Sequence, residues 1–367
     1  MSLKVLLVAG ARPNFMKIAP LYRAAGRFAG LECLIVHTGQ HYDYEMSQTF
    51  FDDLELPEPD HFLEAGSGSH AEQTARIMVA FEKVCAAEAP GLVMVVGDVN
   101  STLACSIVAK KLLVPVAHIE AGLRSFDLTM PEEINRMVTD AISDHFFVTE
   151  ESGRANLLRE GKPESAVHLV GHVMVDNLLH QAARLDRLDT SGFATARLKE
   201  AHPDYYFLTL HRPANVDDPE TLRGIVECLN RIAEDFPIFF PVHPRTGKML
   251  EKFSLSLSDR IHRLPPLGFR ESLFLWRDAR AVLTDSGGLQ EETTALGIPC
   301  LTLRENTERP VTMELGTNIL AGNRPKGIMA AYGKLQESIA SERRECRVPL
   351  WDGRAAERIW EVLLPDS

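Results

Sequence analysis

The chain has 367 residues, 45% of them hydrophobic and 25% charged, which is more chain than one hydrophobic core usually holds, so two domains are predicted. Its formal net charge of −12 disfavours DNA or RNA as a partner, because a phosphate backbone needs a basic surface. A small anionic ligand is compatible with this charge if local arginines and lysines hold it.

In the first half of the chain, short apolar runs alternate with longer amphipathic segments. Several runs are continuous in Val, Ile and Leu, which is typical of parallel strands buried on both faces. The predicted strands are Lys4–Ala9, Cys33–Thr38, Leu92–Gly97, Val116–Ile119, His145–Val148 and Val167–Val170. Helices are expected between them, for example over Ser101–Leu113, which has one apolar face and is followed by Pro115.

The same alternation restarts after Leu178–Asp204, a polar stretch with no clear strand. The strands predicted in this second half are Tyr205–Leu210, Ile238–Val242, Ile261–Leu264, Ala281–Thr284 and Cys300–Leu303. Two such series predict an α/β protein with two doubly wound, Rossmann-like domains facing a cleft. The expected divisions are 1–172, 173–349 and a C-terminal segment, 350–367, whose helix could pack on either domain, with the first as the expectation.

The spacing of the cysteines and the lengths of the apolar runs indicate in which cellular compartment the protein lies. The six cysteines are scattered singly without a CxxC pair, so neither a zinc site nor a disulfide framework is expected. The N-terminus enters a strand at once and lacks the features of a signal peptide, and no uncharged apolar run reaches the length of a membrane span. We therefore expect a cytoplasmic protein with neither a membrane nor a nucleic acid as partner.

The first polar segment is GARPNFMK, directly after the first strand, at the sheet edge where α/β proteins bind ligands. It is not GxGxxG, so the nicotinamide-binding fingerprint fails where it should appear. Arg12 and Lys17 place two cations there, about one helical turn apart, which suits an anionic ligand. The alternative is a solvated arginine and a lysine on a helix surface.

Three carboxylates follow neighbouring strands of the first sheet. Asp98, in VVGDVNST, could instead cap a helix. Glu120, in HIEAGLRS, ends a strand, where burying a carboxylate is costly. Glu132, in MPEEINR, lies in the first turn of a helix that Pro131 begins, and it could form an ordinary surface pair with Arg136. Converging at one sheet edge, the three carboxylates would supply a general base and a general acid.

The second half carries the most specific physical signal, LTDSGGLQEE. Its glycines precede a helix near Leu289, and exposed N–H groups with the helix dipole form a cradle for pyrophosphate. Glu291 or Glu292, one turn into this helix, could bind ribose hydroxyls. His211, in TLHRPANVDD, could pair with a phosphate or move a proton, or be an ordinary loop histidine. Arg309, in RENTERP, adds a cation, or is a solvated loop residue.

These segments together resemble the non-hydrolysing UDP-N-acetylglucosamine 2-epimerases, in order from about residue 4 to about residue 325. The segments that carry the resemblance are GARPNFMKIAPL, HTGQHYD, GDVNSTLA, HIEAGLRS, PEEINR, GHVMVDNLL, TLHRPANVD, TDSGGLQEE and NTERP. The resemblance implies the glycosyltransferase-B architecture, with the active site between two Rossmann-like domains. It also implies interconversion of UDP-GlcNAc and UDP-ManNAc without NAD or an essential metal, and a homodimer.

The resemblance also implies roles for particular residues. The catalytic carboxylates fall on Asp98, Glu120 and Glu132, and the catalytic histidine on His211. The contacts to UDP fall on Arg12, Lys17, Ser286, Gly287, Gly288, Glu292 and Arg309. In the mechanism that this implies, loss of UDP acidifies the C2–H bond, a base completes elimination to 2-acetamidoglucal, and UDP adds back after protonation on the opposite face.

The chain departs from the family pattern at several places. Asn14 stands where many members have a carboxylate, and the stretch GFRESLFLW leaves Phe269 or Phe274 as the uracil contact. Many bacterial members bind a second UDP-GlcNAc as an activator through a segment HRREN, which reads HRPAN here, so Ala214 stands at the Glu position. In the facing loop Gln40 matches the family, whereas Asp43 replaces a common Gln. We therefore expect this activator site to be weakened.

Alternative functions share this fold. A hydrolysing 2-epimerase would release free ManNAc and UDP, and relatives act on UDP-sugars with a 3-acetamido group or a 6-carboxylate. A glycosyltransferase would use the SGG–Glu element, but it would need one base and an acceptor groove rather than three carboxylates. A non-enzymatic sugar-nucleotide sensor would leave the carboxylates without a role.

Overall fold

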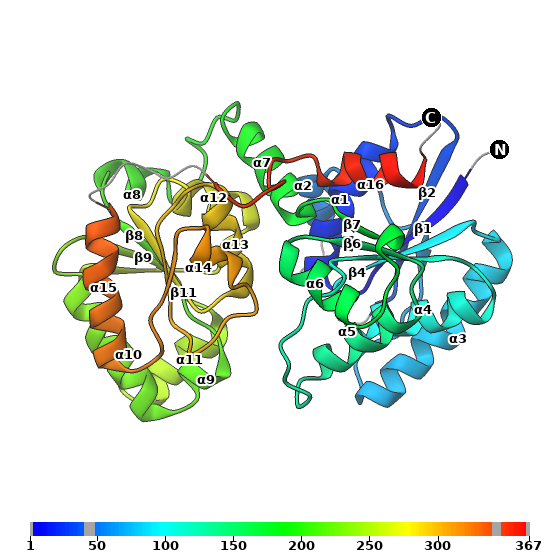
Figure 1. The fold of residues 1–367 in the computed structure, drawn as a ribbon. Coiled ribbons are helices and arrows are strands. Elements are labelled where there is room, and N and C mark those ends of the chain that lie inside the picture. The colour runs from blue at the N-terminus through cyan, green and yellow to red at the C-terminus, as the bar shows by residue number, and fades with distance from the viewer. Residues whose placement is uncertain (1–2, 40–47, 340–345, 365–367) are drawn as a thin grey trace. The chain divides into compact units, whose positions relative to one another are not determined.

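The computed structural model describes residues 3–39, 48–339 and 346–364, and the chain divides into two compact units (Figure 1). Unit 1 extends to Leu179 and resumes at Pro349, and unit 2 runs from His180 to Val348. Each unit is built on one parallel sheet, which confirms the predicted α/β class with two doubly wound sheets.

The sheet of unit 1 has the strand order β3-β2-β1-β4-β5-β6-β7. Its strands are β1 (Leu3–Ala9), β2 (Leu31–His37), β3 (His61–Phe62), β4 (Leu92–Val96), β5 (Val116–Ile119), β6 (His145–Val148) and β7 (Val167–Leu169). Its helices are α1 (Arg12–Ala25), α2 (Gln48–Leu54), α3 (His70–Glu88), α4 (Asn100–Lys111), α5 (Pro131–Ile142), α6 (Glu151–Arg159), a 3-10 turn (Glu164–Ala166), α7 (Val173–Leu185), which continues into unit 2, and α16 (Ala355–Leu363).

The sheet of unit 2 has the strand order β10-β9-β8-β11-β12-β13. Its strands are β8 (Tyr206–Thr209), β9 (Ile238–Pro241), β10 (Ile261–Leu264), β11 (Ala281–Thr284), β12 (Cys300–Thr302) and β13 (Asn318–Leu320). Its helices are α8 (Ala196–Ala201), α9 (Pro213–Val216), α10 (Pro219–Ile232), α11 (Pro244–Lys252), α12 (Phe269–Trp276), α13 (Gly287–Ala295), α14 (Val311–Glu314) and α15 (Pro325–Ile339).

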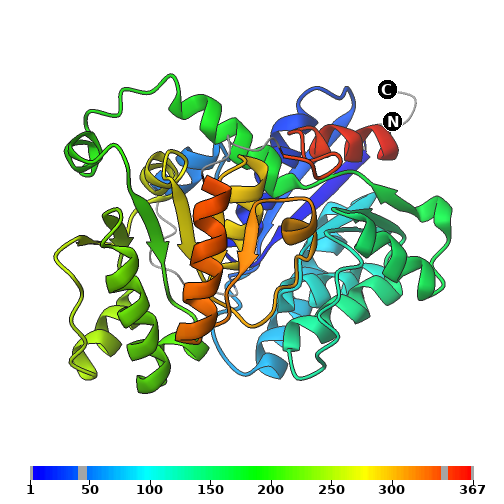
Figure 2. The ribbon, with the colours of Figure 1, turned by 60° about the vertical axis from the view of Figure 1, so that its left-hand side comes forward.

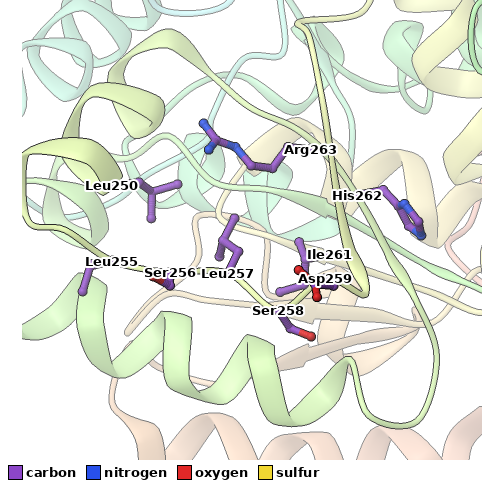
Figure 3. A pocket seen from close by; sticks show the side chains of 9 residues that line it. All are labelled: Leu250, Leu255, Ser256, Leu257, Ser258, Asp259, Ile261, His262 and Arg263. Atoms are coloured by element: carbon purple, nitrogen blue, oxygen red, sulfur yellow. The ribbon is translucent and has the colours of Figure 1, made fainter.

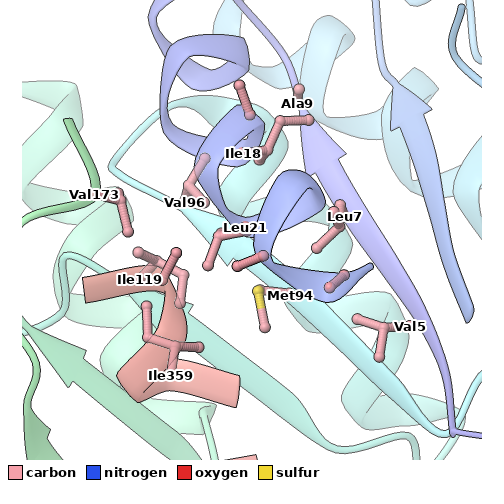
Figure 4. Close-up of a cluster of buried hydrophobic side chains, with 14 of the residues drawn as sticks. Val5, Leu7, Ala9, Ile18, Leu21, Met94, Val96, Ile119, Val173 and Ile359 are labelled. Carbon is pink, nitrogen blue, oxygen red and sulfur yellow. The ribbon is translucent and has the colours of Figure 1, made fainter. Parts of the chain in front are cut away.

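Alternate residues of the central strands face opposite sides of the unit 1 sheet, and each side is covered by helices. Val5 and Leu7 of β1 belong to a cluster that includes Ile18 of α1 and Ile359 of α16 (Figure 4). The neighbouring positions of β1 belong to a second cluster, built with side chains of α3 and α4. Burial on both faces explains why these strands appear in the sequence as continuous apolar runs.

The C-terminal helix α16 belongs to unit 1, where it packs on α1. Hydrogen bonds anchor it in addition to its apolar face. Asp176 of α7 accepts hydrogen bonds from the backbone N–H groups of Ala355 (3.1 Å) and Ala356 (2.8 Å), at the start of the helix. The indole Nε1 of Trp360 donates to the carbonyl oxygen of Leu21, 2.9 Å away.

In unit 2 the helices α10 and α15 pack together over one face of the sheet, and Figure 2 shows α15 lying along its strands. Their apolar side chains and those of β8 form one buried cluster. The hydroxyl group of Tyr332 on α15 lies 3.1 Å from that of Tyr206 on β8, so the buried polar ends of both rings are satisfied.

The predicted strands are confirmed within one or two residues at each end, and the short strands β3 and β13 were missed. The two residues of β3 are too few for a periodic pattern, whereas β13 is as long as β7 and β12, which were predicted. The helix predicted over Ser101–Leu113 is α4, which begins at Asn100 and ends at Lys111. It ends early because Leu113 has a φ of 61°, which is incompatible with a right-handed helix.

Both sheets have a topological switch point, where the chain runs outward in opposite directions from two central strands. In unit 1 these strands are β1 and β4, and in unit 2 they are β8 and β11. Ligands of open α/β sheets bind beyond the carboxyl ends of the strands at such points. The loops after these four strands carry most of the polar segments that the sequence analysis identified.

Candidate active site

The loop after β1 delivers Arg12 and Lys17, both on α1. Asn14, on the first turn of this helix, is buried and links the two central strands of unit 1. Its Oδ1 accepts from the backbone N–H groups of Gly10 (3.2 Å) and Ala11 (2.9 Å), and its Nδ2 donates to the carbonyl oxygen of Val96 (3.2 Å). The amide is suited to this place because it both accepts and donates, which a carboxylate does not.

Glu120 lies at the carboxyl end of β5 with its side chain buried beside Lys17. The Nζ of Lys17 is 2.5 Å from Oε2 of Glu120, and Nδ1 of the buried His172 is 3.7 Å from Oε1. Glu120 has a φ of 66°, a left-handed conformation that costs free energy for a residue with a Cβ. Gly97 leaves room for this pair, since a Cβ built on it would lie 3.1 Å from Nζ of Lys17.

Asp98 follows β4 and is bound by Arg136 of α5. The Nε and Nη2 atoms of Arg136 lie 3.0 Å and 2.8 Å from Oδ2 of Asp98. Asp98 is therefore not the N-cap of α4, a position that Val99 holds. Arg136 also contacts Glu133, so the simple surface pair between Glu132 and Arg136 is not what the structure shows.

The two glutamates at the start of α5 differ sharply in environment. Glu133 is buried and accepts from the backbone N–H groups of Ser125 and Phe126, each 3.0 Å away. Burial raises the pKa of Glu133, but these N–H groups and Arg136 outweigh it and hold the pKa below its usual value. Glu132 is exposed. Glu133 therefore organises the loop that follows Glu120, and Glu132 is accessible to a substrate.

Sequence reasoning did not identify a buried network that joins the loops of Asp98 and Glu120. The Nε2 of His118 lies 2.8 Å from the carbonyl oxygen of Gly97, and Nδ1 lies 2.7 Å from Oδ1 of Asp140. Oδ2 of Asp140 accepts from the backbone N–H of Gly122. The signal that could have found the network is a histidine inside an otherwise apolar strand, two residues before Glu120.

The charges in this network follow from its hydrogen bonds. Burial raises the pKa of Asp140, but His118 and Arg124, whose Nη1 lies 2.8 Å from Oδ2, outweigh it and keep the pKa below its usual value. Asp140 is thus an anion, and the carbonyl group of Gly97 can only accept. His118 therefore lies between two acceptors, the carboxylate of Asp140 and the carbonyl oxygen of Gly97.

In unit 2 the loop after β8 is held by Asp285, the residue that follows β11. Asp285 is fully buried and accepts from the backbone N–H groups of His211 (3.0 Å) and Arg212 (2.8 Å). Its Oδ1 also lies 3.0 Å from Nδ1 of His211. Burial raises the pKa of Asp285, but these contacts outweigh it and lower the pKa. An anionic Asp285 fixes the orientation of the His211 ring and favours a proton on Nδ1.

The helix α13 begins at Gly287, with Ser286 as its N-cap residue, close to the predicted start. A Cβ built on Gly287 would lie 3.7 Å from Nη2 of Arg212 and 3.8 Å from Nη1 of Arg304. Arg304 was not among the predicted site residues. Two guanidinium groups thus lie beside a glycine-rich helix start, an arrangement that favours an anion.

The second turn of α13 carries two buried carboxylates in contrasting states. Glu291 is paired with Arg309, so the guanidinium group of this predicted UDP contact lies against α13 and is not a solvated loop side chain. Burial, together with the charge of Glu291, raises the pKa of Glu292 to about 8. The buried Gln290 of the same helix accepts a hydrogen bond from Thr307 Oγ1 at 2.7 Å, which fixes the loop of Arg309 against the helix.

Within unit 1, the structure brings together residues from the loops after β1, β4 and β5 and from the start of α5. Of the predicted residues, Lys17 contacts Glu120 and Asp98 contacts Arg136 of α5, while Arg12 and Glu132 lie on the first turns of α1 and α5. Within unit 2, the loops after β8, β11 and β12 form a second group. Its predicted residues are His211, Ser286, Gly287, Gly288, Glu292 and Arg309. Gln40 and Asp43, named for the activator site, lie outside the described residues.

A cavity of about 500 Å³ lies elsewhere in unit 2, along β10 and the segment before it (Figure 3). Its lining includes Leu257, Asp259, His262 and Arg263, and none of the candidate site residues. In the part of the chain that the structure describes, no group of three or more His, Cys, Asp or Glu side chains is arranged to hold a metal ion. No helix among the described residues has the length and apolar character needed to cross a membrane.

Comparison with known proteins adds independent evidence. The model of the UDP-N-acetylglucosamine 2-epimerase family matches residues 23–364. A UDP-N-acetylglucosamine 2-epimerase of Methanocaldococcus jannaschii is 42% identical over 367 residues, covering 98% of this chain and 99% of the relative. A UDP-2,3-diacetamido-2,3-dideoxy-D-glucuronate 2-epimerase of Pseudomonas aeruginosa is 42% identical over 324 residues, covering 87% of this chain and 88% of the relative.

Solved structures agree with these matches. The crystal structure of the M. jannaschii UDP-GlcNAc 2-epimerase in complex with UDP-GlcNAc and UDP matches with a TM-score of 0.86 at 41% identity, covering 99% of this chain and 100% of that chain. The enzyme of Neisseria meningitidis bound to UDP-GlcNAc matches with a TM-score of 0.86 at 29% identity, covering 99% of this chain and 100% of that chain.

Proposed function

The chain belongs to the UDP-N-acetylglucosamine 2-epimerase family and is an isomerase, and on this premise we propose that it interconverts UDP-GlcNAc and UDP-ManNAc without hydrolysing them. The observation that carries the proposal is Glu120, a buried carboxylate held beside a lysine in strained backbone at the edge of the unit 1 sheet. Strain of this kind persists where the surrounding structure over-determines it, and it is concentrated at active sites.

The chemistry requires UDP to leave before C2 can lose its proton, because no carbonyl group lies next to C2. As the C1–O bond breaks, positive charge develops at C1 and the C2–H bond becomes acidic. One carboxylate takes this proton, which gives 2-acetamidoglucal and UDP. A second group then delivers a proton to the opposite face of C2 while a phosphate oxygen of UDP bonds to C1. Both epimers pass through the same intermediate, so the site must stabilise UDP throughout.

The roles of the residues follow from their environments. We propose that Asp98, Glu120 and Glu132 serve C2 as acids and bases. His211, with Nδ1 facing Asp285, donates from its other nitrogen to the departing UDP. Arg12 and the start of α13 hold the phosphates, and Glu292 binds the ribose. Lys17, expected as a UDP contact, has its ammonium group on Glu120, where it favours the carboxylate form.

The uracil contact is proposed to be Phe269, the first residue of α12. Its alternative, Phe274, has its ring against Phe193 (centroids 5.2 Å apart) and the Nζ of Lys199 (3.7 Å from the centroid). A ring covered in this way is poorly placed to stack on a base. We also propose, from the family resemblance, that the enzyme is a cytoplasmic homodimer and needs no cofactor. Size-exclusion chromatography with light scattering tests the oligomeric state.

Proton NMR of UDP-GlcNAc incubated with the enzyme in heavy water tests the function. We expect UDP-ManNAc to form, with deuterium at C2 of both epimers and slow release of UDP. Free ManNAc together with stoichiometric UDP would indicate a hydrolysing enzyme. Retention of protium at C2 through complete epimerisation would contradict the exchange of protons with two carboxylates.

A second candidate substrate is supported by one observation. The P. aeruginosa relative named for UDP-2,3-diacetamido-2,3-dideoxy-D-glucuronate is as similar to this chain, at 42% identity, as the M. jannaschii relative named for UDP-GlcNAc. Assaying both UDP-sugars separately and in competition decides between them. We expect the higher kcat/KM with UDP-GlcNAc, and the reverse order would reassign the substrate.

A further inference from the structure

Three loops of unit 2 meet at the start of α13. Arg212 follows β8, Gly287 follows β11 and Arg304 follows β12, and both guanidinium groups approach Gly287 to within 4 Å of where a Cβ would lie. Any side chain at this position would enter the space between the arginines. The bare glycine and the two cations therefore define a space that suits an anion beside the helix N-terminus.

An anion of the protein itself is bound to one of these arginines. Glu308 lies in a two-pronged ion pair with Arg304, with 3.0 Å from Nη1 to Oε2 and 2.7 Å from Nη2 to Oε1. Burial raises the pKa of Glu308, but Arg304 and the charge of Arg212 outweigh it and lower the pKa to about 2. The parallel two-oxygen contact is the one that arginine also makes with phosphate.

The neighbours of Glu308 are fixed to the same helix. Thr307 donates to Gln290, and Arg309 is paired with Glu291, both on the second turn of α13. The segment therefore runs alongside the helix, with Glu308 itself paired to Arg304, one of the two arginines beside the first turn. The residues on either side of Glu308 are anchored to α13 by their side chains, so its carboxylate is not a loose surface group.

We propose that Arg304 binds the diphosphate of UDP and that Glu308 occupies the phosphate position on Arg304 until UDP displaces it. This inference rests on the proposed function. A diphosphate carries more charge than a carboxylate and also reaches the N–H groups of α13. UDP therefore displaces Glu308 from Arg304. The carboxylate lowers the apparent affinity for UDP, because only molecules in which Arg304 is released bind it.

Isothermal titration calorimetry of the full-length protein with UDP and with uridine tests the displacement. In E308Q the Kd for UDP is expected to fall at least about threefold, because a neutral amide competes less well for the guanidinium. Glu314→Gln, the same change at an exposed glutamate of α14, is the matched control and should leave the Kd unchanged. Uridine has no phosphate, so its Kd should be the same in all three proteins.

A Kd for UDP in E308Q that equals or exceeds the wild-type value would overturn the displacement. Arg304 is tested in the double variant R304Q/E308Q, since removing Arg304 alone would leave Glu308 without its partner. We expect this variant to melt like E308Q and to bind UDP at least about tenfold more weakly than E308Q, the usual effect of losing a charged hydrogen bond. Equal affinity of the two would exclude Arg304 as a ligand. Failure of the wild-type protein to bind UDP would contradict the proposed function instead.

Discussion

The backbone conformation and the charged partner of each carboxylate set its environment in the candidate site, and Glu120 is an example. Its left-handed backbone aims a carboxylate back under β5, where Lys17 and His172 lie within 4 Å of its oxygens. Asp98 is likewise paired with a cation, Arg136, whereas Glu132 is exposed. Two carboxylates paired with cations and one exposed carboxyl group are a suitable set for removing a proton from one face of C2 and delivering one to the other.

Removing the charge from each carboxylate tests this arrangement. Asp98→Asn, Glu120→Gln and Glu132→Gln are each expected to lower turnover about 10²-fold or more, the usual scale for acid–base residues. Their affinities for UDP should change far less, because the proposed contacts to UDP come from other residues, Arg12 and the loops of unit 2. Steady-state kinetics and calorimetry measure the two effects, with Glu82→Gln on α3 as an exposed control. Near-normal turnover in all three variants would show that the site is misplaced.

The buried His118 is expected to act as a positioning residue. Its Nε2 contacts the carbonyl group of Gly97, the residue before Asp98. Its Nδ1 contacts Asp140, which in turn binds the backbone of the loop after Glu120. His118→Gln should therefore lower kcat by about 10- to 100-fold, as small displacements of reacting groups do, with KM changed much less. Asp140→Asn should give a similar loss.

The control for this prediction is His145→Gln, a change at a half-buried histidine of β6 in the same unit. It should leave kcat unaltered. A His118→Gln enzyme that melts earlier but keeps its full kcat would show that the network stabilises unit 1 without aligning the carboxylates.

At the scale of elements, the helices of unit 1 position the site through their first turns. Pro131 begins α5 with a fixed φ, which sets Glu132 and Glu133 at the N-terminal end of the helix, where the dipole favours negative charge. On the other side of the sheet, α16 packs on α1, the helix that carries Arg12 and Lys17. The C-terminal segment thus supports a helix of the site.

The junction of α7 and α16 should make stability depend on pH. Burial raises the pKa of Asp176 to about 6, although it accepts from two N–H groups of α16. Because the folded-state pKa lies above that of the unfolded chain, the stabilising contribution is complete below about pH 4 and is lost as the pH rises through about 6. The loss amounts to about 2 to 3 kcal/mol.

Melting temperatures of the wild type and of Asp176→Asn between pH 4 and pH 8 measure this contribution. The wild type is expected to lose stability relative to Asp176→Asn as the pH rises across this range. The melting temperature of Asp259→Asn, a change at an exposed aspartate, should vary with pH in parallel with that of the wild type. If the difference between wild type and Asp176→Asn does not change with pH, Asp176 is ionised throughout.

At the scale of the whole molecule, both units share one topology, and most of the proposed site residues lie beyond the switch points of their sheets. One departure from the family lies in the loop after β8. Pro213 begins the short helix α9, and Ala214 is exposed on it, so the position offers no side-chain acceptor. An unmade charged hydrogen bond of this kind typically costs about 1.5–3 kcal/mol.

We therefore expect hyperbolic kinetics, and conversion of UDP-ManNAc that starts without added UDP-GlcNAc. Progress curves of the reverse reaction measure this directly. A lag that a trace of UDP-GlcNAc abolishes would contradict it. Ala214→Glu restores the carboxylate found in many bacterial relatives, and it should shift the enzyme towards a lag if the missing acceptor is the cause.

The sequence by itself determined the α/β class, the central strands and the loops that follow them. Continuous Val, Ile and Leu runs such as Leu92–Val96 can only be buried on both faces, so they predict parallel strands, and the polar residues after them must lie at one edge of the sheet. The ordered set of motifs also indicated the family. The strands β3 and β13 were missed; β3, with two residues, carries too short a pattern to be found.

Only the tertiary structure decided which charges meet. Local spacing suggested a pair between Glu132 and Arg136, yet Arg136 binds Asp98, which is 38 residues away. Lys17 was expected on UDP but contacts Glu120 across 103 residues. The periodicity of a helix fixes neighbours three or four positions apart, whereas these partners are set by strand order, which places the loops of β1, β4 and β5 side by side. A burial pattern reports that a side chain faces inward, and only the fold decides what it meets there.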